Sequence, residues 1–501
     1  MKSLRRFFAI LLIAGLLEGG TTGKITGTVT GPNGESLAGA NVIIDGLYLG
    51  AAADADGRFY ILNVPPGTYT LTFSMIGYKT QKTEGVVVHS DLTTTVNAQL
   101  TVTVLESGEE VVVKARRPMI KKDATASAAV ISSQTIEDSP VETFQAIVQT
   151  KAGVSVDAGG ALHFRGGRAD EIAYLIDGVP NVNPFNNQIG VDIATNAIEE
   201  LSVITGSFSA EYGQAMSGVV NIVTKNPGKV FHGSVSYMGG DMLTNYDLDV
   251  HPLIQDYAQP YNFGNLQEME ATLTGYIPFW DRIRFFISTR NNQRQGTLFG
   301  LTKYNAYGAL QDSSDWKVFA ANPSDKLNLQ AKLSYYVNDN IKLQYNYISE
   351  NSTWKSYSHT RKYLKWGHYQ NVKNAETHML QWTHQLGTKT FYTLNYSNSR
   401  NFYEYYAYKN PEDPRLVWGG YYVRDSNYEF YSGGTNNGRY EREVNTNLFN
   451  AQLTSQIAKH HEIKVGFERR NHAFDLLSWS INVDRRDEPW DDSNNNDVWD
   501  E

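Results

Sequence analysis

The C-terminal half of the chain alternates apolar and polar residues with a period of two. The stretch IKLQYNYI at residues 341–348 is one example, and LNLQAKLSY at residues 327–335 is another. Such alternation is typical of a strand whose two faces meet different surroundings, and a membrane-spanning strand needs about 9 to 11 residues. In this register we expect lipid-facing Leu343 and Tyr345, and lumen-facing Lys342, Gln344 and Asn346.

Extended along the chain, the pattern predicts about nine strands that form the first part of an antiparallel transmembrane β-barrel. The expected strands lie near residues 229–241, 265–277, 282–294, 325–336, 341–351, 373–385, 390–402, 440–457 and 462–475. Most of the 31 tyrosines and all 9 tryptophans fall in this half, where we expect them in interfacial girdles and loops.

The connections between these strands alternate in length. Short turns are expected near 278–281, 337–340, 386–389 and 458–461, and long polar loops near 242–264, 295–323, 352–372 and 403–438. Short turns at one end and long loops at the other are typical of an outer-membrane barrel. A large soluble all-β protein such as a propeller is the alternative, but the sequence shows no blade repeat.

The N-terminal half shows two other patterns. Residues 24–100 contain short strand patterns separated by turn signals, such as Asn33-Gly34, which predict a small β-sandwich. Residues 116–228 predict a mixed α/β unit that ends in SAEYGQAMSGVVNIVTKN, where a Gly-studded segment leads into an apolar, β-branched strand. Residues 101–115 connect the two units.

The first residues have the pattern of a secretory signal peptide, which we assign to residues 1–23. Lys2, Arg5 and Arg6 are basic, and the apolar stretch 7–17 is too short to span a bilayer as a helix. A short buried or interfacial helix is the alternative.

Composition excludes several classes of protein. The net charge of -9, with no long basic run, argues against nucleic-acid binding. The chain has no cysteine, which excludes disulfides, thiolate metal sites and cysteine nucleophiles. None of the 11 histidines begins an H-E-x-x-H motif, the spacing that a zinc peptidase needs, so we expect no enzyme activity.

Two segments resemble known families. Residues 24–100, with GTVTGPNGESLAGANVIIDG and GRFYILNVPPGTYTLTFSMIGY, resemble the carboxypeptidase regulatory-like domain, which implies an immunoglobulin-like fold. Residues 116–228 resemble the plug domain of TonB-dependent outer-membrane receptors. The matching plug signature consists of Arg165, Gly166, Asp177, Gly178, Tyr212, Gly213 and Gly218.

The resemblance implies a function. It indicates a receptor in the cell outer membrane that contacts membrane lipid and imports a scarce, bulky solute, energised by the partner protein TonB. Siderophore, cobalamin, glycan and peptide all remain open as solutes. A structural or adhesive barrel whose sandwich binds a partner is the alternative, and an anchor for a surface lipoprotein is a third interpretation. The family's barrel has about 22 strands, so the sequence is expected to be a fragment that stops in an extracellular loop.

The resemblance also directs attention to particular residues. A TonB box is expected just before the plug, at Glu109, Glu110, Val111, Val112 and Val113, with a simple linker or sandwich strand as the alternative. Solute contacts are expected on two plug loops, 167–171 and 181–188. The candidate ligand-binding residues are Arg168, Asn181, Asn183, Phe185, Asn186 and Asn187.

Two further features depart from simple expectation. The chain has Thr205-Gly206-Ser207 where the family often has Arg-Gly-Pro, so the retention of the plug is expected to rest on other contacts. We expect no cofactor apart from one candidate calcium site in the acidic C-terminal stretch. Asp492, Asn494 and Asn496 have the spacing of a calcium loop, although Asp497 replaces its glycine, and a solvated acidic loop is the alternative.

Overall fold

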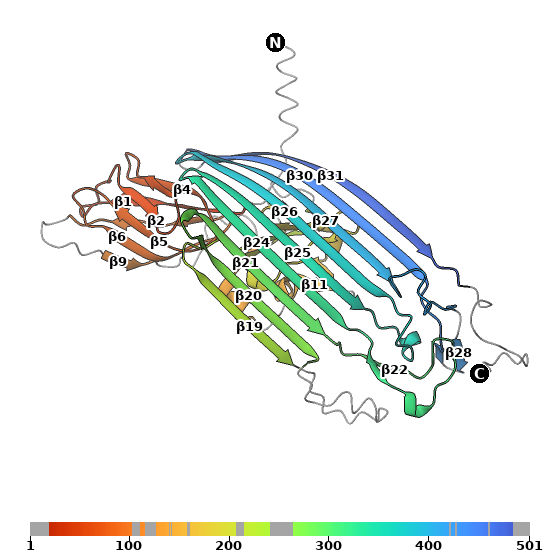
Figure 1. Cartoon of the computed structure of the whole chain (residues 1–501). Coiled ribbons are helices and arrows are strands. Elements are labelled where there is room, and N and C mark those ends of the chain that lie inside the picture. Colours follow the sequence, from red (N-terminus) through yellow and green to blue (C-terminus); the bar gives the residue numbers. More distant parts are fainter. Residues whose placement is uncertain are drawn as a thin grey trace, which may run out of the picture.

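The computed structural model describes residues 20–102, 111–115, 127–139, 141, 143–157, 161–206, 215–240, 264–419, 422–425, 428–458 and 461–483. Three bodies of strands follow one another along the chain (Figure 1). Within these described ranges, no helix has both the length and the apolar character needed to cross a membrane.

The N-terminal body is a β-sandwich, as predicted. Its strands are β1 (Gly23–Thr30), β2 (Asn41–Ile44), β3 (Gly50–Ala52), β4 (Arg58–Val64), β5 (Gly67–Ser74), β6 (Gln81–Val88), β7 (Thr93–Thr95), β8 (Ala98–Gln99) and β9 (Val111–Lys114). One sheet has the order β4-β1-β7 with β8 also paired to β1, and the other has the order β3-β2-β5-β6-β9. Alternate side chains of β1 and β5 are buried between the sheets, where they pack with Phe59 and Val42.

The second body is the mixed α/β unit. Its elements are β10 (Ser127–Ser132), α2 (Ser133–Glu137), α3 (Phe144–Gln149), β11 (Val154–Val156), β12 (Leu162–Phe164), η1 (Ala169–Glu171), β13 (Ile172–Ile176), β14 (Val179–Pro180), β15 (Val182–Asn183), β16 (Gln188–Ile189), η2 (Thr195–Ala197), β17 (Ile198–Thr205) and β18 (Gly218–Thr224). The central sheet has the order β10-β17-β18-β13-β14.

Strand β18 explains the abrupt change in the sequence at this point. All seven of its residues are buried, because it lies between β17 on one side and β13 on the other. A continuous apolar, β-branched run suits such a position. Gly218 opens the strand against the ring of Phe164, where an added Cβ would lie 2.1 Å from Cδ2. Only glycine allows this approach.

The third body is a nine-stranded antiparallel sheet, which confirms the predicted barrel strands. Its strands, in both sequence and spatial order, are β19 (His232–Gly240), β20 (Leu266–Ile277), β21 (Trp280–Arg294), β24 (Ser324–Asn338), β25 (Ile341–Lys355), β26 (Gln370–Gly387), β27 (Thr390–Tyr406), β30 (Gly438–Ala458) and β31 (His461–Ser480). The remaining elements lie in the connections: β22 (Phe299–Leu301), β23 (Val318–Ala320), β28 (Tyr422–Asp425), β29 (Tyr428–Tyr431), η3 (Ser313–Asp315) and η4 (His359–Arg361).

The sheet has two different ends. At the short-turn end, β24 passes to β25 and β26 passes to β27 within two residues. At the long-loop end, the connections carry β22, β23, β28 and β29, and Figure 1 shows them opposite the N-terminal sandwich. The predicted alternation of turn lengths is therefore confirmed for these connections.

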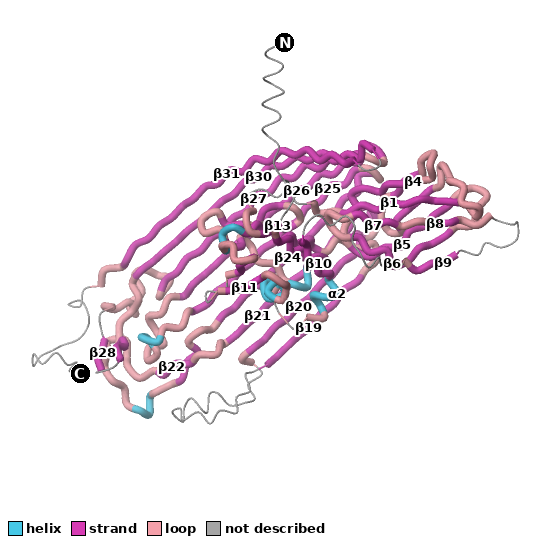
Figure 2. The backbone as a smooth tube through the Cα atoms, turned by 180° about the vertical axis from the view of Figure 1, so that it is seen from behind, coloured by secondary structure: helices cyan, strands magenta, loops and turns pink. Residues whose placement is uncertain are grey.

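The two faces of the sheet also differ, as the register predicted. The α/β unit lies against the inner face (Figure 2). Gln344 and Asn346 are buried on that face, and Asn346 donates a hydrogen bond to Asp177 of the α/β unit. Lys342 lines a cavity together with Asp177, so it also lies on the inner side. Tyr345 is exposed on the outer face.

Candidate functional site

The α/β unit is joined to the sheet through a buried carboxylate. Asp177 Oδ2 lies 2.9 Å from Lys332 Nζ of β24, and the Lys332 side chain is only 1% exposed. The Asp177 carboxylate also accepts hydrogen bonds from Asn346 Nδ2 at 2.8 Å and from the Thr224 backbone at 2.9 Å. A buried ion pair requires this degree of satisfaction, because neither charge has water around it. This cluster fixes the end of β13 to the barrel wall.

A second set of charges holds the segment between β16 and η2. Lys326 of β24 forms an ion pair with Asp192, and Lys373 Nζ of β26 lies 2.7 Å from Glu350 Oε2. The backbone N–H of Asp192 donates to Glu350 Oε2 at 2.9 Å, and Asn328 donates to the Asp192 carbonyl at the same distance. Asp192 of the α/β unit is therefore held directly by β24 and β25, and Lys373 of β26 supports it through Glu350.

These contacts show how the α/β unit is held, although the chain has Thr205-Gly206-Ser207 where the family often has Arg-Gly-Pro. Arg165 occupies the space beside Gly206, where an added Cβ would lie 2.8 Å from Arg165 Nη1. Retention instead rests on the ion pairs of Asp177 and Asp192 with the wall. Sequence reasoning missed Lys326 and Lys332, although both share the strand parity of the inner face.

The loop 181–188 points toward the long-loop end. Asn183 Nδ2 donates to Asn401 Oδ1 at 3.2 Å, and Asn401 Nδ2 donates to the Gly190 carbonyl at 2.7 Å. Beyond this contact, the guanidinium of Arg442 lies 4.4 Å from the centre of the Phe185 ring. Asn401 and Arg442 belong to the long-loop halves of β27 and β30, so the tip of the loop faces that opening.

Beside this loop tip the wall carries a group of five aromatic residues, which we call the aromatic shelf: Trp354, Tyr369, Tyr403, Tyr405 and Tyr440. Tyr405 and Tyr440 stack with ring centroids 5.4 Å apart and an interplanar angle of 7°. Trp354 stacks on Tyr403 at 6.0 Å, and Tyr369 lies 4.6 Å from Tyr405. Each ring is half-buried, so part of its surface remains open.

The shelf combines flat apolar faces with hydrogen-bonding groups. Arg442 lies 5.4 Å from the Tyr403 ring as well as over Phe185, so it joins the shelf to the loop tip. Burial raises the pKa of Tyr369, with a further contribution from Tyr405, so its hydroxyl remains a neutral donor at neutral pH. Such a surface stacks on rings and binds polar edges, but it has no nucleophile or general base arranged for a reaction.

The predicted solute-binding residues have different positions. Phe185, Asn186 and Asn187 are exposed at the loop tip. Asn181 is buried, and its amide exchanges two hydrogen bonds with the Val191 backbone, at 2.7 and 2.9 Å. Asn183 is also buried and donates to the wall. The amides of Asn181 and Asn183 thus hold the loop in place, and their contact with a solute stays a prediction.

Arg168 lies on the separate loop 167–171. Its backbone N–H donates to Glu171 Oε2 at 3.1 Å, and its carbonyl accepts from Ser217 at 3.5 Å. The structure does not bring these contacts to the aromatic shelf, since they lie within the α/β unit. Sequence reasoning missed Arg442 and all five residues of the shelf, Trp354, Tyr369, Tyr403, Tyr405 and Tyr440. Strand parity could have found Tyr403 and Tyr405, since both share the parity of Asn401.

Four residues of the plug signature form tight backbone turns. Arg165 and Gly166 adopt positive φ values of 48° and 80° in the turn after β12, and Asp177 and Gly178 adopt 48° and 78° between β13 and β14. Tight turns of this kind favour Gly, Asn and Asp. Tyr212 and Gly213 lie outside the described residues.

The candidate TonB box lies at the edge of the N-terminal sandwich. Strand β9 pairs in parallel with β6, with Val112 opposite Lys82. Val112 is 55% exposed and Val113 is 42% exposed. Glu109 and Glu110 lie outside the described residues, as do the calcium candidates Asp492, Asn494 and Asn496. In the described ranges there is no group of His, Asp and Glu side chains that could hold a metal ion.

Comparison with known proteins identifies two domains. Residues 24–101 match the carboxypeptidase regulatory-like domain, and residues 120–220 match the TonB-dependent receptor plug domain. Among solved structures, the siderophore receptor PirA from Acinetobacter baumannii aligns with 71% of this chain and 49% of its own, at 16% identity and a TM-score of 0.49.

Curated relatives extend the match. The TonB-dependent transporter Oar of Myxococcus xanthus is 25% identical over 62% of this chain and 30% of its own length. The TonB-dependent receptor SusC of Bacteroides thetaiotaomicron is 30% identical over 42% of this chain and 22% of its own length. The chain therefore spans a third or less of the length of these relatives. Such proteins are receptors and transporters rather than enzymes. The chain thus contains a carboxypeptidase regulatory-like domain followed by a TonB-dependent receptor plug domain, and its curated relatives are TonB-dependent receptors and transporters.

Proposed function

We propose that this chain forms the receptor part of an energised importer in the outer membrane, which takes up a bulky polar solute with help from TonB. The observation that carries the proposal is the position of the aromatic shelf. The shelf and the tip of the plug loop 181–188 face the same opening, while the candidate TonB box lies at the other end of the molecule. One end is thus suited to capture and the other to energy input.

The two ends are assigned by the lengths of the connections. In outer-membrane barrels the short turns face the periplasm and the long loops face the outside. The long-loop end, with the aromatic shelf, is then extracellular. The sandwich and β9 are periplasmic, on the side from which TonB delivers energy.

The chemistry of the shelf narrows the class of solute. Stacked Tyr rings offer flat faces, and Arg442, Asn186 and Asn187 offer donors beside them. We propose a solute that presents ring faces together with hydroxyl or amide groups, such as an oligosaccharide or an aromatic-containing peptide.

The position of the sandwich counts against the adhesive alternative. The Tyr48 ring of the sandwich lies 5.2 Å from the Tyr336 ring of β24, next to the short turn between β24 and β25. A sandwich docked at the periplasmic end is far from any partner at the cell surface. We therefore favour import over adhesion.

Uptake in cells tests the proposal. Strains with and without the receptor gene, each with and without TonB, receive four labelled probes: a maltodextrin mixture, an oligopeptide mixture, cyanocobalamin and a ferric hydroxamate. We expect uptake of one polar probe, from the first two mixtures, to require both the receptor and TonB. Receptor-dependent uptake that persists without TonB would contradict energised import, as would no receptor-dependent uptake of any probe.

A further inference from the structure

The N-terminal sandwich is docked on the plug through a buried carboxylate. Glu200 of β17 is 2% exposed. It accepts hydrogen bonds from the backbone N–H of Ser90 at 3.0 Å, from the Ser90 hydroxyl, and it lies 2.7 Å from His89 Nδ1. Three of the contacts of this plug carboxylate therefore come from one turn of the sandwich. A buried charge is normally satisfied by the folded state itself, so the docked sandwich is part of the resting structure.

A buried cation of the barrel wall depends on the sandwich in the same way. Arg284 of β21 is 2% exposed, and its side chain lies beside two neighbouring rings. Its guanidinium is 5.3 Å from the Tyr48 ring of the sandwich and 4.7 Å from the Tyr336 ring of the wall. Arg284 Nη1 also donates to the Gly46 carbonyl of the sandwich at 3.3 Å. If the sandwich moved away, Arg284 would lose its contact with the Tyr48 ring and its hydrogen bond to the Gly46 carbonyl.

Two ion pairs complete the contact at strand β31. Lys24 Nζ of β1 lies 2.9 Å from Glu462 Oε2, and Lys464 Nζ lies 3.2 Å from Asp91 Oδ1. All four side chains are partly exposed, and pairs of this kind contribute little individually. These exposed pairs therefore add little to the docking, which rests mainly on the contacts of the buried Glu200 and Arg284.

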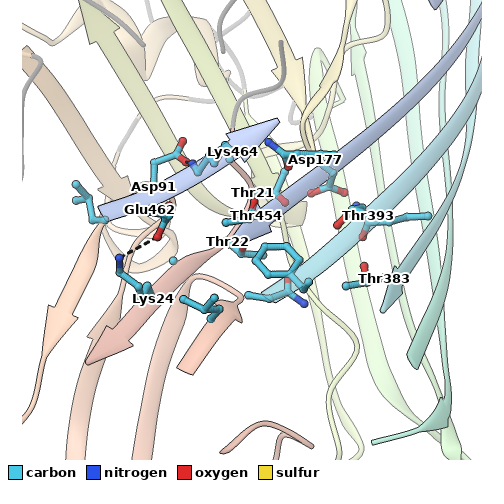
Figure 3. Close-up of a pocket in the computed structure, with 18 of the residues that line it drawn as sticks. Thr21, Thr22, Lys24, Asp91, Asp177, Thr383, Thr393, Thr454, Glu462 and Lys464 are labelled. Carbon is cyan, nitrogen blue, oxygen red and sulfur yellow. Dashed lines mark hydrogen bonds and ion pairs between the residues drawn. The ribbon is translucent and has the colours of Figure 1, made fainter. Parts of the chain in front are cut away.

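A polar chamber of about 90 Å³, partly open to its surroundings, lies where sandwich, plug and wall meet (Figure 3). Thr383, Thr393 and Thr454 contribute from three neighbouring strands of the wall, and Asp177 contributes from the plug. The chamber therefore adjoins the ion pair that joins plug to wall, because Asp177 belongs to both. Gly23 and Lys24 of β1 and the turn at Asp91 form the part of its lining that the sandwich contributes.

The strand order connects the docked sandwich to the candidate TonB box. Strand β9 is the edge of the sandwich sheet, and β10 is the next described strand along the chain. Strand β10 pairs with β17, and Ser132 lies directly opposite Glu200. A pull on β9 would act on the sandwich, and through β10 on the plug strand that the sandwich holds.

We propose that the N-terminal sandwich is a latch, which in the docked position closes the periplasmic exit of the transport path and releases it when the sandwich leaves Glu200 and Arg284. The inference rests on the proposed function, because an exit matters only in a transporter. The sandwich then acts as a movable cap, and its undocking is an obligatory step of uptake.

A reversible tether tests the latch in cells. Tyr48→Cys and Tyr336→Cys together place two thiols at the contact, and the chain has no other cysteine. A reducible bis-maleimide joins them, and binding and uptake of the probe identified above are measured before and after reduction. We expect the tethered receptor to bind the probe normally, to lose uptake to the level of cells without TonB, and to recover uptake on reduction.

A matched control pair lies within the sandwich. Asp45→Cys and Thr72→Cys replace two residues joined by a hydrogen bond of 2.8 Å, so their tether cannot hold the sandwich to the barrel. Uptake at the control rate by the receptor tethered at residues 48 and 336 would overturn the latch. If the receptor takes up no probe even without a tether, the proposed import function is wrong, and the latch is not the cause.

The rate of thiol labelling in purified receptor tests whether the sandwich closes the chamber, without a measurement of transport. Thr454 is 4% exposed and lines the chamber, so Thr454→Cys should react slowly with a water-soluble maleimide in purified receptor. Added Tyr48→Ala removes the ring over Arg284 and should accelerate labelling several-fold, whereas Tyr48→Phe keeps the ring and should not. Equal labelling rates in the three backgrounds would contradict a cap that closes the chamber.

Discussion

At the scale of single residues, strand parity decides which side chains can act. The assignment of Gln344 and Asn346 to the inner face followed from the period-two pattern, because a slip by one residue would have exposed apolar groups to the lumen. The same parity places Tyr403 and Tyr405 on the inner face. They did not stand out in the sequence, because the C-terminal half contains so many tyrosines. Which plug residue meets which wall residue was not predictable, because the partners lie more than a hundred positions apart.

The first prediction concerns the two faces of β25. A charge on the lipid face costs about 2 to 4 kcal/mol near the membrane midplane and less near its surfaces. Leu343 lies near the short-turn end of β25, so Leu343→Arg should cost less than at the midplane but should still impair membrane assembly more than Gln344→Arg on the inner face. Heat-modifiable migration of the receptor in outer-membrane fractions measures assembly. Equal assembly of the two variants would refute the register.

The ion pair between plug and wall gives the second prediction. Lys332→Met leaves the buried Asp177 without its cation, and breaking one side of such a pair costs about 3 to 5 kcal/mol. Asp177→Asn in the same chain removes the orphaned charge and keeps a residue that tolerates the positive φ at this turn. Thermal unfolding in detergent should show a large loss for the single variant and recovery in the double variant. No recovery would show that the loss comes from packing alone.

The third prediction concerns the aromatic shelf. Tyr405→Ala removes a ring that contacts both Tyr440 and Tyr369, and stacking contributes about 0.5 to 1.5 kcal/mol per pair. Probe affinity, titrated by tryptophan fluorescence, should fall roughly 2- to 10-fold. Tyr396→Ala on the outer face of the same strand is the matched control and should leave affinity unchanged. The same loss in both variants would remove the shelf from the binding site.

At the scale of elements, the sequence predicted strands well and their partners poorly. The barrel strands were foreseen because each has its own alternation, and β18 was foreseen because burial on both sides demands an apolar run. The pairing of β9 with β6 was left open between a partner-binding box and a sandwich strand. Four residues with three consecutive valines are compatible with both, because an edge strand needs only a backbone with free donors and acceptors.

The fourth prediction separates those two roles of β9. Val112→Pro removes a backbone donor from the strand and disfavours continued pairing. If β9 is the TonB box, the variant should bind the probe normally at the cell surface and lose energised uptake, whereas Val112→Thr, which keeps the donor, should transport. Wild-type uptake by Val112→Pro, at normal surface levels, would leave β9 as a linker strand.

At the scale of the whole molecule, the proposed sites of solute capture and of energy input lie at opposite ends. The aromatic shelf opens toward the long loops, and the sandwich and β9 lie at the short turns, with the plug fixed between them (Figures 1 and 2). This arrangement was not readable from the sequence, because docking depends on single contacts such as Tyr48 with Tyr336. It requires that TonB reach the sandwich end of the receptor in living cells.

Site-specific cross-linking measures that contact directly. Val112→Cys is introduced into the receptor, together with TonB that carries a single cysteine in its C-terminal domain, and disulfide formation is followed in intact cells. The account predicts a receptor–TonB adduct at residue 112 that increases when the transported probe is added. Ile76→Cys, fully exposed elsewhere on the sandwich, should give none. No adduct at residue 112 in correctly assembled receptor, or equal adducts at both positions, would contradict energised import through this segment.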